Sequence, residues 1–169
     1  MSSDIETQDR KALLELQLKR LQSMLGPILQ NNAFYKQKLN DAGITRPEDI
    51  RTVADYQRLP FTSKTELSTD QIAHPPYGTN LTGSQDQFVR VHQTSGTTGQ
   101  PLRCMDTDES WTWFAQCWKR VYQGAGVIAA DRIFFAFSFG PFIGFWTALE
   151  GARVLGALSL SGGSMTSIQ

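Results

Sequence analysis

The chain has 169 residues, of which 40% are hydrophobic, and its 16 Lys and Arg residues balance 16 Asp and Glu residues. This length fits one ordinary domain with a real core, and the 10 Phe and 4 Trp residues exclude a disordered composition. The net charge of zero gives no electrostatic reason to expect nucleic acid or an anionic membrane surface as a partner.

The cysteines, the N-terminal sequence and the longest uncharged stretch indicate in which cellular compartment the protein is expected. Cys104 and Cys117 are too far apart for a CxxC motif and too few for a disulfide framework or a zinc site. The acidic start of the chain has no apolar segment typical of a signal peptide. Residues 133–149 carry no charge, but they fall short of the usual spanning length and contain Gly and Pro. We therefore expect a reduced, cytoplasmic protein with no metal site and no membrane span.

The first 60 residues predict a helical N-terminal segment. Apolar residues recur at helical spacing through residues 8–40, although Gly26-Pro27 predicts an interruption because proline removes a backbone hydrogen bond. A second helical piece is expected to end near Gly43. Ser63 and Glu66 then have the spacing of a capping box, which predicts the start of another helix.

Residues 61–169 predict a loop followed by strands and helices rather than helices alone. Residues 74–87 are rich in Pro, Gly, Ser and Asn and predict a loop. The elements expected after it are strands at 88–92 and 102–105, a helix from a cap at Asp106 or Thr107 to about 123, a fully buried strand at 132–139, a helix at 144–155 and a strand at 157–160. This order predicts an α/β fold, namely the helical segment followed by part of a doubly wound, mainly parallel sheet with helices.

One loop between the first two strands carries four hydroxyl groups and two glycines in six residues: Thr94, Ser95, Gly96, Thr97, Thr98 and Gly99. Successive backbone N–H groups and hydroxyl donors in such a turn suit a polyphosphate. The loop matches neither the Walker A pattern nor the GxGxxG pattern. The alternative from composition alone is a hairpin loop that binds nothing.

Continued by Gln100 and Pro101, this loop at 94–101 resembles the signature loop of the adenylate-forming, AMP-binding enzymes. Three further segments resemble phenylacetate-CoA ligases: LPFTSK at 59–64, VRVH at 89–92 and FSFGPFIG at 137–144. The similarity runs in order from about Leu18 to Gln169, and the ordered set is specific although each piece alone is weak.

The resemblance implies an ATP-dependent acid-CoA ligase that adenylates an aryl or arylacetic carboxylate and then transfers the acyl group to CoA. ATP with Mg²⁺, CoA and the carboxylate are the implied small molecules, and residues 94–99 would hold the β- and γ-phosphates. Phe137, Phe139 and Phe142 would line the acyl pocket. Core packing of a buried strand remains the alternative for the first two of these rings.

The chain also departs from the family pattern. Gln100 stands where the family has lysine, which predicts weaker polyphosphate binding.

The C-terminal lid domain with the catalytic lysine has no counterpart here, so we expect the N-terminal part of a ligase, with no catalytic residue in this chain and no activity by itself. A dimer or a complementing C-terminal part would then be a partner. The alternatives are a truncated module that binds a nucleotide or a protein partner, and a degenerate product. His92 is expected to be a satisfied structural histidine.

Overall fold

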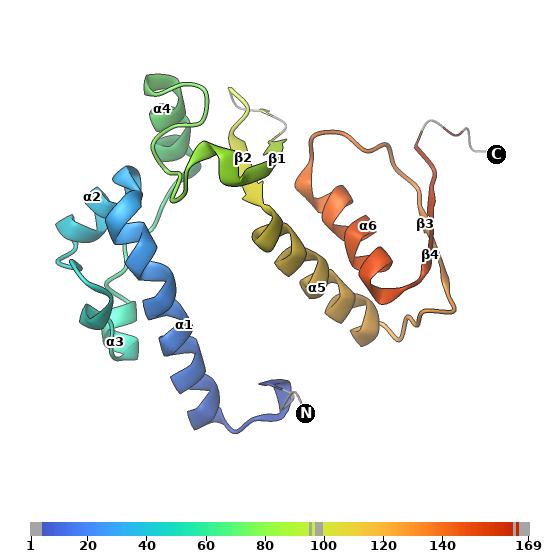
Figure 1. Ribbon diagram of the computed structural model, residues 1–169, viewed down its shortest axis with the longest axis horizontal. Coiled ribbons are helices and arrows are strands. Elements are labelled where there is room, and N and C mark those ends of the chain that lie inside the picture. The colour runs from blue at the N-terminus through green and yellow to red at the C-terminus, as the bar shows by residue number, and fades with distance from the viewer. Residues whose placement is uncertain (1–4, 95, 97–99, 164, 166–169) are drawn as a thin grey trace. The chain divides into compact units, whose positions relative to one another are not determined.

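The computed structural model describes residues 5–94, 96, 100–163 and 165, and Figure 1 shows its helices and strands. The chain divides into two compact units, residues 1–84 and residues 85–169, which we describe separately. Within the described ranges, no helix is both long and apolar enough to span a bilayer.

The first unit is helical. Its elements are η1 (Ile5–Thr7), α1 (Arg10–Asn31), α2 (Ala33–Asp41), η2 (Pro47–Asp49), α3 (Val53–Tyr56) and α4 (Lys64–Ala73), where η denotes a 3₁₀ helix. Its core consists of aliphatic side chains from α1, α2 and the segment after α2: Leu25, Leu29, Leu39, Ile44 and Ile50.

The predicted interruption at Gly26-Pro27 is wrong, because α1 continues through Pro27 to Asn31. The break comes at Asn32, whose extended backbone ends α1 and whose side chain accepts a hydrogen bond from the Tyr35 amide, capping α2. Asn32 is 1% exposed and also donates to the Asn80 carbonyl at 2.7 Å. A capping side chain, rather than the proline, therefore separates the two helices.

Residues 61–84 pack with the helical unit. The Phe34 amide donates to the Thr79 carbonyl at 3.4 Å, and the Lys38 ammonium donates to the Phe61 carbonyl at 2.8 Å. The boundary between the two compact units therefore falls between Ser84 and Gln85 along the chain. A division into domains at residues 1–60 and 61–169 stays a prediction.

Helix α4 begins with the predicted capping box. The Ser63 hydroxyl accepts a hydrogen bond from the Glu66 amide, and the Glu66 carboxylate accepts one from the Ser63 amide. The same carboxylate pairs with Lys38. These hydrogen bonds, led by the one from Lys38, lower the pKa of Glu66 from 4.5 to about 2.

This shift predicts an acid-dependent effect of Glu66→Gln. A depressed pKa means that the ionised form stabilises the fold above about pH 4.5, and that this contribution disappears as the pH falls through about 2. We expect the variant to lose stability at neutral pH and to approach the wild type at pH 2, as measured by urea denaturation followed by circular dichroism. Glu48→Gln, at an exposed site of the same unit, is the control; an equal effect there would contradict the prediction.

The second unit contains the strands. Its elements are η3 (Gln85–Gln87), β1 (Phe88–Gln93), β2 (Arg103–Thr107), α5 (Asp108–Gly124), β3 (Arg132–Phe135), α6 (Ile143–Leu155) and β4 (Leu158–Ser161). Strands β1 and β2 form an antiparallel hairpin, whereas β3 and β4 pair in parallel and are connected through α6. The α/β class is confirmed, with the parallel part present as one β-α-β unit.

Helix α5 packs along α6 in this unit (Figure 1). The Trp118 indole donates to the Thr147 hydroxyl at 2.9 Å, and the Tyr122 hydroxyl donates to the Ala148 carbonyl at 3.0 Å. Small buried residues on α6, among them Ala148, Gly151 and Ala152, let the two helices approach closely.

The predicted strand over residues 132–139 is too long, because β3 ends at Phe135. The Phe137 amide turns back to donate to the Phe135 carbonyl at 2.9 Å, which takes the following residues out of the ladder. Nor is β3 buried on both faces, since Phe134 is 56% exposed while Phe135 is buried. Residues 136–142 therefore form an irregular segment between β3 and α6.

Candidate functional site

The predicted phosphate loop is closed at its base by two reciprocal hydrogen bonds. The Thr94 amide donates to the Leu102 carbonyl at 3.0 Å, and the Leu102 amide donates to the Thr94 hydroxyl at 3.0 Å. Gly96 has a φ of +67°, a conformation that favours glycine. The other predicted loop residues, Ser95, Thr97, Thr98 and Gly99, lie outside the described residues.

The predicted acyl-pocket residues belong to a cluster of aromatic rings. Phe137 stacks on Phe145 with ring centroids 4.1 Å apart, and Phe139 lies 4.8 Å from Trp146. Both phenylalanines also pack against the core that includes Phe135. The two rings are thus half-buried and contribute to the core, as the alternative interpretation of the sequence allowed.

Phe142 differs from these two rings. Its side chain is 39% exposed and meets Phe145 edge-on at a centroid distance of 6.2 Å. Phe145 and Trp146 were not singled out from the sequence. The indole of Trp146 donates to the Gly140 carbonyl at 2.7 Å and so holds the irregular segment against α6.

One backbone contact joins the loop strand to the aromatic segment, by which we mean residues 137–142. The Gln93 amide, directly before Thr94, donates to the Pro141 carbonyl at 3.0 Å. This contact lies within the second unit and brings together two segments more than 40 residues apart in sequence. The sequence alone did not reveal it.

A buried polar cluster lies beside this contact. His92, Asp106 and Trp111 are 6%, 7% and 5% exposed, and the imidazole stacks on the indole with centroids 5.0 Å apart. His92 Nε2 is 3.7 Å from Asp106 Oδ2, which is too long for a hydrogen bond. In the described part of the chain, His92 Nε2, Asp106 Oδ2 and Trp111 Nε1 have no hydrogen-bond partner.

The pKa of His92 is lowered, first by burial and then by the Arg90 guanidinium, while Asp106 and a hydrogen bond to the Pro141 backbone oppose the shift. The side chain is therefore neutral at physiological pH. His92 is structural in the sense of being buried, but the expectation of a satisfied histidine is wrong, because Nε2 has no hydrogen-bond partner among the described residues.

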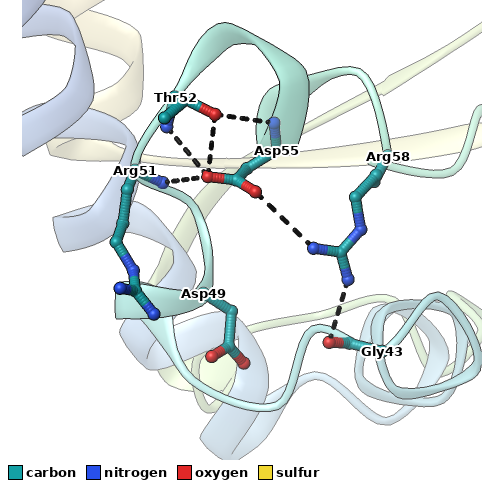
Figure 2. A pocket seen from close by; sticks show the side chains of 6 residues that line it. All are labelled: Gly43, Asp49, Arg51, Thr52, Asp55 and Arg58. Carbon is teal, nitrogen blue, oxygen red and sulfur yellow. Dashed lines mark hydrogen bonds and ion pairs between the residues drawn. The ribbon is translucent and has the colours of Figure 1, made fainter.

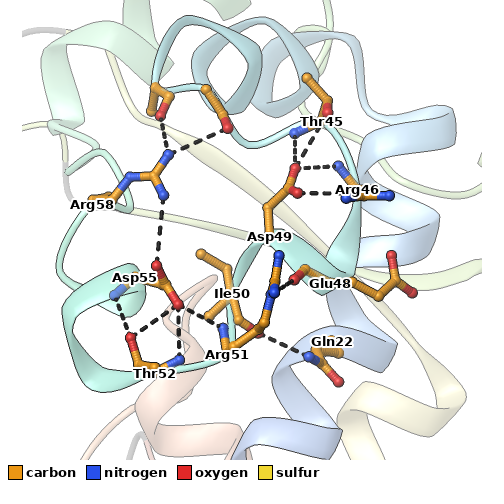
Figure 3. Close-up of polar contacts among 12 residues, drawn as sticks. Gln22, Thr45, Arg46, Glu48, Asp49, Ile50, Arg51, Thr52, Asp55 and Arg58 are labelled. Atoms are coloured by element: carbon orange, nitrogen blue, oxygen red, sulfur yellow. Dashed lines mark hydrogen bonds and ion pairs between the residues drawn. The ribbon is translucent and has the colours of Figure 1, made fainter.

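The first unit has a polar pocket of about 370 Å³ beside α3, drawn in Figure 2. Its carboxylates already have partners: Asp55 accepts a hydrogen bond from the amide of Thr52, the N-cap of α3, and Asp49 accepts hydrogen bonds from the Thr45 and Arg46 amides. These bonds lower the pKa of Asp49 to about 2 and lower that of Asp55. Figure 3 shows that the Arg58 guanidinium pairs with the Asp55 carboxylate and donates to the Ala42 and Gly43 carbonyls. Because its charges balance, we interpret this pocket as a stabilising network of loop caps.

An apolar groove of about 630 Å³ lies between α1 and α3 in the same unit. Leu14, Leu18, Val53 and Tyr56 are among the residues that line it. Among the described residues, no group of three or more His, Cys, Asp or Glu side chains is arranged to hold a metal ion.

Comparison with known proteins finds similar ligases. The chain is 32% identical to a phenylacetate-coenzyme A ligase of Thermus thermophilus over 162 residues, which cover 95% of the chain and 35% of that ligase. It is 34% identical to the phenylacetate-coenzyme A ligase of Escherichia coli over 161 residues, covering 94% of the chain and 36% of that ligase. The chain thus spans about a third of the length of these curated relatives. No protein-family model matches it.

Solved structures agree with this similarity. A crystal structure of 2-hydroxyisobutyryl-CoA ligase, in complex with 2-HIB-AMP and CoA in the thioesterification state, superposes with a TM-score of 0.87 at 30% identity. The match covers 95% of the chain and 34% of that ligase. An open conformation of the same ligase matches with a TM-score of 0.78 at 28% identity.

Proposed function

We propose that the chain, which is similar to phenylacetate-CoA ligases over about a third of their length, belongs to the adenylate-forming enzymes and is the N-terminal portion of an ATP-dependent acid-CoA ligase. In the proposed reaction, a carboxylate oxygen attacks the α-phosphorus of ATP and pyrophosphate leaves. The CoA thiol then attacks the acyl carbon of the adenylate, and AMP leaves.

The hydrogen bond from Gln93 to Pro141 is the observation that best supports this proposal. Adenylation requires the carboxylate to lie against the α-phosphorus, so a phosphate-binding segment and an acyl-binding segment must be neighbours. The contact joins the strand before the loop to the aromatic segment. Residues 94–99 would stabilise the charge of the departing pyrophosphate through backbone and hydroxyl donors, and Mg²⁺ would accompany ATP as part of that substrate.

The aromatic segment favours an aryl or arylacetic acid as substrate. Phe137, Phe139 and Phe142 lie in one ring cluster with Phe145 and Trp146. Aromatic rings that meet at their edges and faces suit another aromatic ring better than a small polar chain. Phe142 is the most exposed ring of this cluster and therefore the most open to a ligand.

The proposal is tested by titrating ATP·Mg²⁺ and phenylacetate into the 169-residue chain in a calorimeter. We expect both to bind, and we expect no ATP-pyrophosphate exchange from these residues alone, since they span a third of the relatives. Binding of neither ligand would contradict the proposal. Binding of ATP·Mg²⁺ without phenylacetate would favour the second candidate, a module that only binds a nucleotide or a protein partner.

The substitution Gln100→Lys tests the departure from the family pattern. A lysine adds a charge-assisted hydrogen bond to the polyphosphate, so we expect ATP·Mg²⁺ to bind about tenfold more tightly. Gln123→Lys, which adds the same charge at an exposed position near the far end of α5, should leave the affinity unchanged. Equal effects of the two lysines, or no tightening by the first, would show that charge at position 100 does not limit binding.

A further inference from the structure

The ring of Phe145, in the first turn of α6, contacts two of the rings predicted to line the acyl pocket. It stacks on Phe137 at an interplanar angle of 27° with centroids 4.1 Å apart, and it meets Phe142 at 87° with centroids 6.2 Å apart. Among the described aromatic rings, Phe145 is the one that contacts both of them. The side chain at position 145 therefore limits the space beside both rings.

Phe145 packs differently from Phe137. The ring of Phe137 packs against the buried core of the second unit, which consists of Phe135, Ala148 and Ala152. In the part of the chain that the structure describes, Phe145 is not one of the side chains that pack against this core, although it is half-buried. Because its ring partners are the predicted pocket residues, core packing does not account for a large aromatic side chain at this position.

The stack of Phe145 on Phe137 leaves no room for a ligand between the two rings. Carbon atoms in contact lie about 3.5 Å apart, so a third ring inserted between two parallel rings needs a centroid separation of about 7 Å. The observed separation is 4.1 Å. One face of Phe137 is thus closed by a side chain and not by backbone, so access to that face depends on the size of the residue at position 145.

The open side of the ring cluster lies at Phe142 and the start of α6. Phe142 is 39% exposed, whereas Phe137 and Phe145 are half-buried. Gly144, directly before Phe145, is exposed and has no atom within 4 Å of an added Cβ. A ligand that approaches from this side reaches Phe145 before the face of Phe137 that Phe145 covers.

We propose that Phe145 is the residue that limits the size of the acyl group, closing the pocket so that it accepts an arylacetic acid with one ring and rejects one with two fused rings. This inference rests on the proposed function, because it specifies which aryl acids the proposed acyl site takes. Phe142 and the part of Phe137 that Phe145 leaves uncovered remain available to a single ring. A second ring would need the space that the Phe145 ring fills.

The first test needs no ligand and measures how fast individual rings are oxidised by hydroxyl radicals. In Phe145→Ala, which uncovers one face of Phe137, we expect Phe137 to react at least threefold faster. Phe139, whose ring lies 4.8 Å from Trp146, should react as in the wild type. Phe145→Leu keeps much of the side-chain volume and should keep Phe137 shielded. Equal acceleration at Phe137 and Phe139 would indicate a general loosening of the cluster and would overturn the proposal.

The second test compares the affinities of the 169-residue chain for phenylacetate and 2-naphthylacetate by calorimetry. We expect the wild type to bind phenylacetate at least tenfold more tightly than 2-naphthylacetate. In Phe145→Ala, 2-naphthylacetate should bind at least tenfold more tightly than in the wild type, because an apolar cavity left by a missing ring can take up another apolar ring. Phe145→Leu should keep the preference of the wild type, since volume and not aromatic character sets the limit.

Leu149→Ala is the matched control for this test. Leu149 lies one turn further along α6 and packs against the buried core, so its truncation loosens the same unit without opening the pocket. We expect the ratio of the two affinities to stay within twofold of the wild type. A shift as large as that of Phe145→Ala would show that any loss of packing admits the larger acid, which would overturn the proposal.

The outcomes separate this inference from the proposed function. If neither acid binds to the wild type or to any variant, the proposed function fails and the inference falls with it. If phenylacetate binds and Phe145→Ala leaves the preference unchanged, the proposed function stands and the inference is overturned. Should Phe145→Ala not fold, Phe145→Val replaces it, with an expected gain in 2-naphthylacetate affinity of at least threefold.

Discussion

Replacing Gly151 by alanine is expected to destabilise the second unit by about 2 kcal/mol, the balance between overpacking and the better helix propensity of alanine. A Cβ atom at position 151 would lie 2.3 Å from Trp118 Cβ and 3.2 Å from the Lys119 backbone nitrogen. These neighbours are fixed to the backbone of α5 and cannot rotate away, so α5 and α6 must separate. Separation would also strain the hydrogen bond from Trp118 to Thr147.

The helix offers a matched control in Gly144, which has no neighbouring atom within 4 Å of an added Cβ. Gly144→Ala should therefore be neutral or stabilise by up to about 1 kcal/mol. All four tryptophans lie at positions 111–146, so their fluorescence during urea denaturation follows the second unit alone. Equal stability of the two variants would mean that the helices are not in close contact.

Local signals in the sequence predicted the elements that depend on local interactions. The capping box at Ser63 and Glu66 places the start of α4, and Thr107, one of the two expected caps, caps α5. In both cases the side chain and its backbone partner are three residues apart. Such signals are read directly from spacing.

Predictions that depended on the surroundings were less accurate. Proline was expected to interrupt the first helix, but α1 accommodates Pro27, and the break is set by Asn32, which is anchored to Asn80 and Thr82 far along the chain. The apolar run at 132–139 has the composition of a strand throughout, yet a turn at Phe135 ends the ladder. Composition cannot reveal where a partner strand stops.

The candidate site shows the same division. The loop was identified from its residue types and a family resemblance, and the aromatic segment from that resemblance, but the backbone hydrogen bond from Gln93 to Pro141 that joins them was not foreseen. Backbone hydrogen bonds carry no residue-type signature, so the contact had no signal in the sequence. That His92 Nε2 and Asp106 Oδ2 have no hydrogen-bond partner among the described residues is likewise a property of the folded chain.

The aromatic segment supports a final prediction that separates its two roles, core packing and acyl binding. Phe137 contacts Phe135, Phe139 and Phe145, so Phe137→Ala should destabilise the second unit by about 3 kcal/mol. Phe142 is 39% exposed. Among the described aromatic rings it meets Phe145 edge-on at 6.2 Å, so Phe142→Ala should cost less than about 1 kcal/mol.

The two substitutions, Phe137→Ala and Phe142→Ala, should differ in their effect on stability but not in their effect on phenylacetate affinity. If both rings face the acyl group, each substitution removes one aromatic contact and should weaken phenylacetate binding about tenfold in calorimetry, equivalent to about 1.4 kcal/mol. Unchanged affinity in Phe142→Ala would remove that ring from the pocket. If Phe137→Ala lowers stability without changing affinity, that ring belongs to the core alone, and the acyl group must then be held by the exposed side of the segment around Phe142.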